Sequence, residues 1–214
     1  MNTHLHVLEA YTNLFRIYPS QEVKEAIIHL LDMFDKHIID SHNHHLVLFF
    51  DETWNRKGAQ VSYGHDIEAA WLLSEAAEVI GEQEWIMKMH HHATLIADAS
   101  LEGIDSDNGM FHEFDPVHNH LVREKHWWPQ AEAMVGFLHA YEVSGNEKYL
   151  EYLLNSWQFI KDHIIDKKNG EWIWGVKDDY ALMKNEDKAG FWKCPYHNSR
   201  ACLEAISRIS KLIK

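Results

Sequence analysis

Cysteine is nearly absent from this sequence, with 2 among 214 residues. Cys194 and Cys202 cannot form a disulfide framework, so we expect a reducing, cytoplasmic environment. The two cysteines flank His197, but neither has a partner at Cys-x-x-Cys spacing. A zinc site is therefore not expected, and no other metal motif stands in its place.

Long apolar runs and an excess of basic residues are missing as well. No run approaches the roughly 20 apolar residues of a membrane span, and the first residues lack the basic segment of a signal peptide. The 33 Asp and Glu outnumber the 20 Lys and Arg, which gives a formal charge of -13. This charge repels nucleic-acid phosphates and anionic membrane surfaces, so we expect neither as a partner. Phosphate-binding glycine loops and serine nucleophile elbows are also missing, so no cofactor is expected.

Histidine and tryptophan are abundant, with 18 and 9 residues. Aromatic rings with polar edges are typical of sugar-binding clefts, because a ring stacks on the apolar face of a pyranose. This composition favours a small neutral ligand.

The sequence contains an internal repeat of about sixty residues. Four segments share a Glu-Ala pair, whose glutamates are Glu9, Glu68, Glu132 and Glu204. Each complete unit has apolar residues at spacings of three and four, then a breaker ("YPS", "VIGEQ" or "VSGNE"), then a second amphipathic run. The units therefore predict helical hairpins.

Tandem hairpins predict an all-α fold with about seven helices, an α-solenoid or part of an α/α toroid, in one domain over residues 1–214. A closed ring of six hairpins needs nearly twice as many helices. Three stretches between hairpins, "LVLFFDETWN", "NGMFHEFDP" and "NGEWIWGV", are expected to form short strands or β-hairpins.

Two of the shared glutamates follow a histidine by three positions, which puts each pair on one helix face. Equivalent positions of successive hairpins face the same mouth of a toroid. We therefore expect one cavity lined by His6, His65, Trp128, Glu132 and His197. A local capping or structural role is the alternative for each His-Glu pair.

Other histidines and tryptophans have no equivalents in the repeat. The clusters at 42–45 and 90–92 are expected to be solvent-exposed or loop histidines rather than ligands. Trp172 and Trp174 alternate along a short predicted strand, and we expect them to pack rather than bind.

Neutral histidines near helix N-termini suit proton abstraction next to a carbonyl. That reaction needs a base on one face of the carbon, an acid on the other, and a donor near the enolate oxygen.

Four stretches, "NTHLHVLEAY", "SYGHDIEAAWLL", "KHWWPQAEA" and "GFWKCPYHNSRACLEA", resemble the C-terminal half of the N-acylglucosamine 2-epimerase superfamily. The resemblance runs from Asn2 to the end and is greatest to the cellobiose 2-epimerase branch. It implies an (α/α)6 barrel and metal-free inversion at C2 of a reducing-end glucose unit, through ring opening, a cis-enediolate and reprotonation.

The resemblance also implies roles for individual residues. His65 and His197 resemble the acid/base pair on opposite faces of C2, and His6 resembles the residue that assists ring opening and stabilises the enediolate. The implied sugar contacts are Asn2, Glu68 and Glu132 at hydroxyls, Trp128 and Trp192 as stacking platforms, and Trp71 as a further wall.

Members of this superfamily are about twice as long as this chain. We therefore expect self-association, a missing partner polypeptide or a truncated gene product. Two other functions stay open: a glycoside hydrolase that uses Glu68 and Glu132, and an inactive sugar-binding protein. A metal-dependent variant is a more distant alternative. The preferred sugar also stays open among cellobiose, mannobiose, lactose and an N-acyl sugar.

Overall fold

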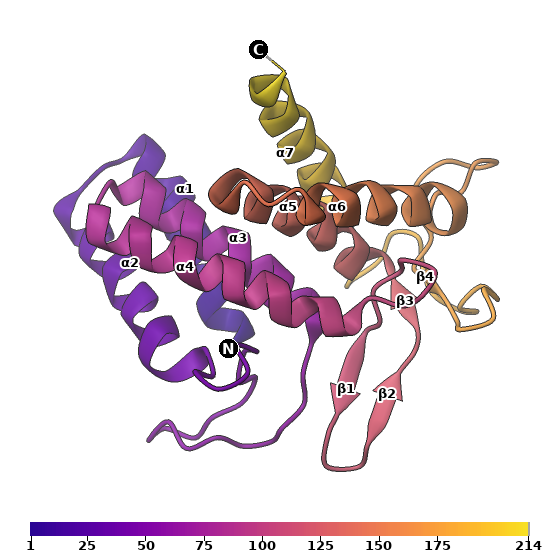
Figure 1. The fold of residues 1–214 in the computed structure, drawn as a ribbon, viewed down its shortest axis with the longest axis horizontal. Coiled ribbons are helices and arrows are strands. Elements are labelled where there is room, and N and C mark those ends of the chain that lie inside the picture. Colours follow the sequence, from indigo (N-terminus) through magenta and orange to yellow (C-terminus); the bar gives the residue numbers. More distant parts are fainter. Residues whose placement is uncertain (214) are drawn as a thin grey trace.

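The computed structural model describes residues 1–213 and contains seven α-helices in that range (Figure 1). Lys214, the last residue of the expected domain, lies outside the described residues. The helices are α1 (Asn2–Ile17), α2 (Gln21–Met33), α3 (Tyr63–Ile80), α4 (Gln83–Ser100), α5 (Trp127–Ser144), α6 (Lys148–Phe159) and α7 (Tyr196–Leu212). The predicted all-α class and the number of helices are confirmed.

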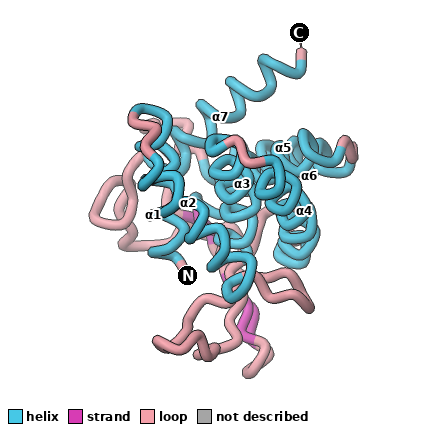
Figure 2. Tube along the Cα trace, turned by 90° about the vertical axis from the view of Figure 1, so that its left-hand side faces the viewer, coloured by secondary structure: helices cyan, strands magenta, loops and turns pink. Residues whose placement is uncertain are grey.

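The helices form two layers. Helices α1, α3, α5 and α7 contact one another in that order, while α2, α4 and α6 pack against their outer side (Figures 1 and 2). The sequence explains this arrangement, because α3 and α5 are apolar or small on almost every face and are buried on almost every face. Helices α2 and α6 carry apolar residues on one face only, as outer helices do.

The predicted breaks between paired helices are confirmed. Gly81 ends α3 and Gly145 ends α5, each in the left-handed conformation at φ of 73° and 68°. Their backbone N–H groups donate to the carbonyls of Ala77 and Tyr141, so each glycine closes its helix and turns the chain back.

Short strands occupy the loops at one end of the helices. Strand β1 (Glu113–Asp115) pairs with β2 (His120–Val122), and β3 (Lys125–His126) pairs with β4 (Gly175–Val176), both antiparallel. The expected strands in the second and third stretches are therefore found.

Within "LVLFFDETWN", where a short strand or β-hairpin was expected, the structure has no named strand but isolated antiparallel bridges, one of which joins Phe50 to Arg56 around a turn. Asp51 accepts hydrogen bonds from the backbone N–H groups of Thr53 and Asn55, and these local bonds favour a turn over a ladder.

The C-terminal part of α7 projects away from the other helices (Figures 1 and 2). Its apolar residues Leu203, Ile206 and Leu212 are exposed. Beside them, an apolar groove of about 430 Å³ runs between α6 and α7 and includes Leu154 and Trp157. Among the described residues, no helix has the length and apolar character needed to cross a membrane.

Candidate active site

A cavity of about 730 Å³ lies where the N-terminal ends of α1, α3, α5 and α7 meet the loops. Histidine and tryptophan dominate its wall. The lining residues are Asn2, His6, Glu9, His65, Glu68, His112, His126, Trp127, Trp128, Trp174, Trp192, Tyr196 and His197. Most residues singled out from the sequence are therefore brought together, and Trp71 and Glu132 are the exceptions.

Trp71 and Glu132 lie beneath the cavity instead of lining it. Trp71 is 1% exposed and Glu132 is 0% exposed. The Trp71 indole Nε1 donates to Glu132 Oε2 at 3.0 Å. The structure thus places both side chains behind the cavity wall, and the expected roles of Trp71 as a wall and of Glu132 as a hydroxyl contact stay predictions.

His197, in the first turn of α7, rests on this buried carboxylate. Its Nδ1 lies 2.7 Å from Glu132 Oε1. A carboxylate at that distance accepts the Nδ1 proton, so the other ring nitrogen, Nε2, is left to act as acid or base. The ring centroid of Trp128 is 5.6 Å from that of His197 and 4.8 Å from that of His65. Trp128 thus touches both imidazoles.

His65, in the first turn of α3, has no carboxylate partner in the part of the chain that the structure describes. Its Nδ1 is 2.8 Å from the hydroxyl oxygen of Ser62. Burial, together with the neighbouring imidazoles of His6, His112 and His197, lowers the pKa of His65 to about 4. His65 is therefore neutral at pH 7 and able to accept a proton.

Arg200 holds three carboxylates together and was not singled out from the sequence. Its guanidinium donates to Glu9 at 2.5 Å and to Glu68 and Glu132 at 2.7 Å each. Burial raises the pKa of Glu68, and the adjacent Glu132 raises it further. For Glu132, the positive charge of Arg200 and the bond from His197 outweigh burial, so its pKa is lowered. Glu132 is thus the stable anion of the pair.

The same guanidinium bears on metal binding. Glu68, Glu132 and His197 have ligand atoms close enough together to hold a metal ion. Arg200 Nη2 is bonded to both carboxylates, so a cationic group already occupies the position that a metal would need. The residues present fit an organic proton-transfer site better than a metal centre.

His6 and Glu9 form a second His-carboxylate pair, on α1. His6 Nδ1 is 3.2 Å from Glu9 Oε2, and this hydrogen bond raises the pKa of His6. Burial raises the pKa of Glu9, but the bonds from His6, Arg200 and Tyr196 outweigh it and bring that pKa down to about 2. His6 therefore carries a proton more readily than His65 does.

Sequence reasoning missed two further histidines of the wall. His112 and His126 stack with ring centroids 4.1 Å apart, and burial lowers the pKa of each to about 4. The signal was their place beside aromatic residues, in "MFHEF" and "KHWW". Trp174 was expected only to pack. Its ring centroid lies 4.5 Å from that of Trp127, and it also lines the cavity.

A family model described as N-acylglucosamine 2-epimerase (GlcNAc 2-epimerase) matches residues 1–201 of the chain. The chain belongs to this family. A cellobiose 2-epimerase from Bacteroides fragilis is 44% identical over 206 residues, which cover 96% of this chain and 53% of that protein. One from Dictyoglomus turgidum is 42% identical over 210 residues, which cover 98% of this chain and 53% of that protein.

Solved structures of epimerases superpose closely on this family member. A sugar epimerase from a ruminal bacterium has a TM-score of 0.93 at 36% identity, over 97% of this chain and 53% of that one. The cellobiose 2-epimerase of Spirochaeta thermophila has a TM-score of 0.90 at 39% identity, over 100% of this chain and 53% of that one. The fold is thus that of part of an epimerase (α/α)6 barrel, and the chain spans about half the length of the relatives it matches.

Outside the cavity, some histidines of this epimerase-family chain differ from expectation. His45 was expected to be solvated, but it is buried, with Nδ1 2.7 Å from Asp66 Oδ2. Asp66 is fully buried at the start of α3, and a buried carboxylate needs such a partner. His92 likewise bonds Asp35 at 2.9 Å.

Proposed function

We propose that this chain carries the proton-transfer site of a sugar 2-epimerase that acts on a disaccharide with a reducing-end glucose unit. One observation carries the proposal: His65 and His197 line the same cavity, both against Trp128, and Glu132 orients His197. Two imidazoles at one carbon are what inversion by proton abstraction and return requires.

In this reaction, one imidazole removes the C2 proton of the open-chain sugar. The electron pair of the C2–H bond forms the C1–C2 double bond of a cis-enediolate, and the C1 carbonyl oxygen takes the negative charge. The other imidazole then gives a proton to the opposite face of C2. In this direction the neutral His65 is the base, and His197, whose imidazolium the Glu132 carboxylate stabilises, is the acid. The C1 carbonyl re-forms as the proton reaches C2, and the reverse reaction exchanges the two roles.

His6 and Glu68 complete the polar wall. The raised pKa of His6 suits a hydrogen-bond donor to the developing enediolate oxygen and to the ring oxygen during opening. Glu68 Oε2 has no hydrogen-bond partner among the described residues, so it is free for a sugar hydroxyl. Asn2 is placed on the same wall for a further hydroxyl contact.

Two tryptophans suit the sugar rings. Trp128 lies against both catalytic imidazoles and would stack on the reacting glucose unit. Trp192 is 79% exposed at the rim of the cavity, where a second sugar ring would extend. A disaccharide therefore fits this arrangement better than a single hexose.

The two other functions have less support. Glycoside hydrolases need two carboxylates beside the bond, and the fully buried Glu132 has both oxygens occupied by Trp71, His197 and Arg200. The family 76 glycoside hydrolase structures that resemble this chain do so at 14–16% identity, which is a likeness of fold alone. An inactive sugar-binding protein would not exchange the C2 hydrogen.

The active ring also needs the helices that this chain does not supply. Seven helices are described, and six complete hairpins need five more. The relatives have further residues that this chain does not match, since the chain spans 53% of their length. The apolar groove between α6 and α7 is a surface that the other helices of the ring would cover.

The experiment that tests the function follows deuterium at C2 of cellobiose by NMR in D2O. One sample contains the purified chain alone, and the other contains the chain with the N-terminal half of the Bacteroides fragilis relative. His197→Ala is the test variant, and His91→Ala, at an exposed position of α4, is the matched control.

Deuterium at C2 in either sample, lost in His197→Ala and kept in His91→Ala, supports the proposal. No deuterium in either sample, from a folded chain that forms a complex with the added half, would overturn it. Size-exclusion chromatography with light scattering establishes whether that complex has formed.

A further inference from the structure

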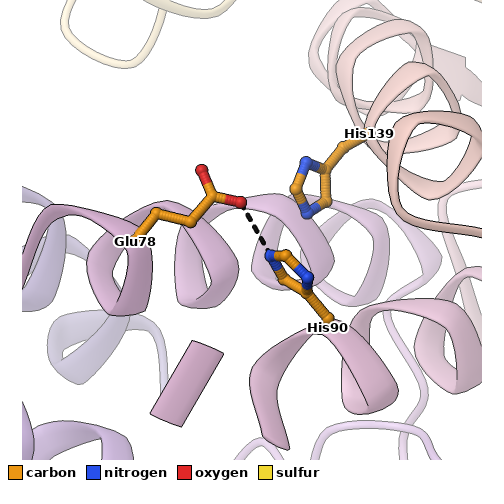
Figure 3. Close-up of side chains that lie close together, drawn as sticks. All are labelled: Glu78, His90 and His139. Atoms are coloured by element: carbon orange, nitrogen blue, oxygen red, sulfur yellow. Dashed lines mark hydrogen bonds and ion pairs between the residues drawn. The ribbon is translucent and has the colours of Figure 1, made fainter. Parts of the chain in front are cut away.

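A second cluster of histidines and a carboxylate lies at the opposite end of the inner helices. Glu78 comes from the last turns of α3, His90 from α4 and His139 from the C-terminal half of α5 (Figure 3). Glu78 is ten residues after Glu68 on the same helix, so the cluster is about 15 Å along that helix from the sugar cavity. The reaction proposed above makes no use of it.

The three side chains converge. Glu78 Oε1 is 2.7 Å from His90 Nε2, and one ligand atom from each of the three residues lies within 4.8 Å of the others. His139 is only 2% exposed, and its Nε2 has no hydrogen-bond partner among the described residues. Figure 3 shows one ring nitrogen of His139 pointing toward Glu78 and His90. An unpaired buried nitrogen aimed at two ligand-type groups calls for a partner.

We propose that Glu78, His90 and His139 bind a first-row divalent transition metal ion such as Zn²⁺. Two imidazole nitrogens and one carboxylate oxygen form a donor set that suits this class of ion, with water as the fourth ligand. Metal–ligand bonds of about 2.0–2.1 Å place tetrahedral ligands roughly 3.3 Å apart, so the three atoms need only small shifts.

The groups around His139 are compatible with a metal on its Nε2. Its Nδ1 lies 3.2 Å from Arg208 Nη1 and 3.8 Å from Glu142 Oε2. In the free chain Arg208 donates to Nδ1, so a metal on Nε2 requires the imidazole proton to move to Nδ1 and Arg208 to give up this bond. Glu142 is then the nearest acceptor on that side. Arg208 bonds Glu142 at 2.8 Å and Glu204 at 2.9 Å, so its charge is balanced by these two carboxylates.

The metal would act as a clamp. Its ligands belong to α3, α4 and α5, so one ion would join the second hairpin of the fold to the third. Because the ion binds the folded chain and not the unfolded one, it stabilises the fold.

The test is a titration of the full chain with Co²⁺, followed by visible absorption, and then with Zn²⁺ as competitor. The test variants are Glu78→Gln and His90→Ala, which change partly exposed residues and leave the buried His139 in place. His91→Ala, one residue away and exposed, is the matched control. His197→Ala reports binding at the other Glu-His cluster.

We expect one Co²⁺ per chain, displaced by Zn²⁺, with a thermal midpoint that rises when metal is added. Glu78→Gln and His90→Ala should weaken binding about 100-fold, since loss of an outer-shell partner alone costs about 10–100-fold. His91→Ala and His197→Ala should bind within about twofold of the unmodified chain. Absence of binding by the folded chain, unchanged binding by His90→Ala, or loss of binding in His197→Ala would each overturn the proposal.

Discussion

The two ends of the inner helices carry similar side chains in different arrangements. On α7, Arg200 lies at the cavity end and Arg208 at the far end. Both guanidinium groups lie over the Trp71 ring, with Cζ 4.9 Å and 5.8 Å from its centroid. Each arginine faces glutamates and one histidine. The chemistry proposed for each end nevertheless differs, and the position of the arginine explains why.

At the cavity end, Arg200 lies between the carboxylates and binds them directly. The side chains of Glu68 and Glu132 are 1% and 0% exposed, so their charges depend on this one cation. At the far end, Arg208 pairs with Glu142 and Glu204 and contacts His139 only at Nδ1. The Nε2 side is therefore left open to a metal, whereas the cavity end is already neutralised.

The largest effect that separates the two ends is expected from His197→Ala. Loss of a general acid or base costs about 10²–10⁴-fold in rate, and the C2 exchange rate should fall by that factor. The rate is measured by deuterium NMR with the complementary half present. Circular dichroism checks that the variant is folded, and a loss below tenfold would contradict the assignment.

Replacing each arginine in turn shows how much each end contributes to the free energy of unfolding. Arg200→Met leaves three carboxylates without their cation, and we expect about 3–5 kcal/mol less free energy of unfolding. Arg208→Met should cost about 1 kcal/mol, because its partners Glu142 and Glu204 are 25% and 31% exposed. Urea denaturation measures both, and equal losses would show that the ends do not differ in this way.

Acid should weaken the cavity end through its buried histidines. The pKa values of His65, His112 and His126 are lowered from 6.5 to about 4 in the folded chain. Between pH 6.5 and 4 the unfolded chain therefore binds more protons, so the free energy of unfolding falls as pH falls, by on the order of 3 kcal/mol for each of the three histidines. His6, whose pKa is raised, opposes this trend.

Urea denaturation at several pH values measures this dependence. His126→Asn removes one of the three groups and should make the slope across pH 6.5 to 4 shallower by up to one proton. His91→Ala is the control. If the pH dependence of His126→Asn equals that of His91→Ala, or is steeper, the titrating groups lie elsewhere in the chain.

The smallest effect is expected from Ser62→Ala. The Ser62 hydroxyl lies 2.8 Å from His65 Nδ1, and one such hydrogen bond contributes about 1 kcal/mol. The C2 exchange rate should therefore fall about fivefold, with Ser207→Ala, at an exposed position of α7, as control. A fall beyond 100-fold would assign Ser62 a direct part in proton transfer.

The fold was largely predictable because it follows from local patterns. Apolar spacings and the breakers at Gly81 and Gly145 define helices and turns within single hairpins. No strand forms between residues 46 and 55, because the Asp51 side chain accepts hydrogen bonds from backbone N–H groups that a strand would pair with a neighbour.

The site was predictable only where the repeat marks it. The repeat brought His6, His65 and His197 to one cavity. It could not show that Glu132 lies beneath the surface, because burial depends on how closely α3 and α5 pack. Arg200 was missed for a similar reason, since its three partners lie on three other helices.

The most direct test of the comparison measures the C2 exchange rate of His197→Ala and His90→Ala side by side, with the complementary half present. We expect His197→Ala to lose exchange by at least about 100-fold and His90→Ala to keep it within about twofold. Equal losses in the two variants would contradict the separation of proton transfer at one end from cation binding at the other.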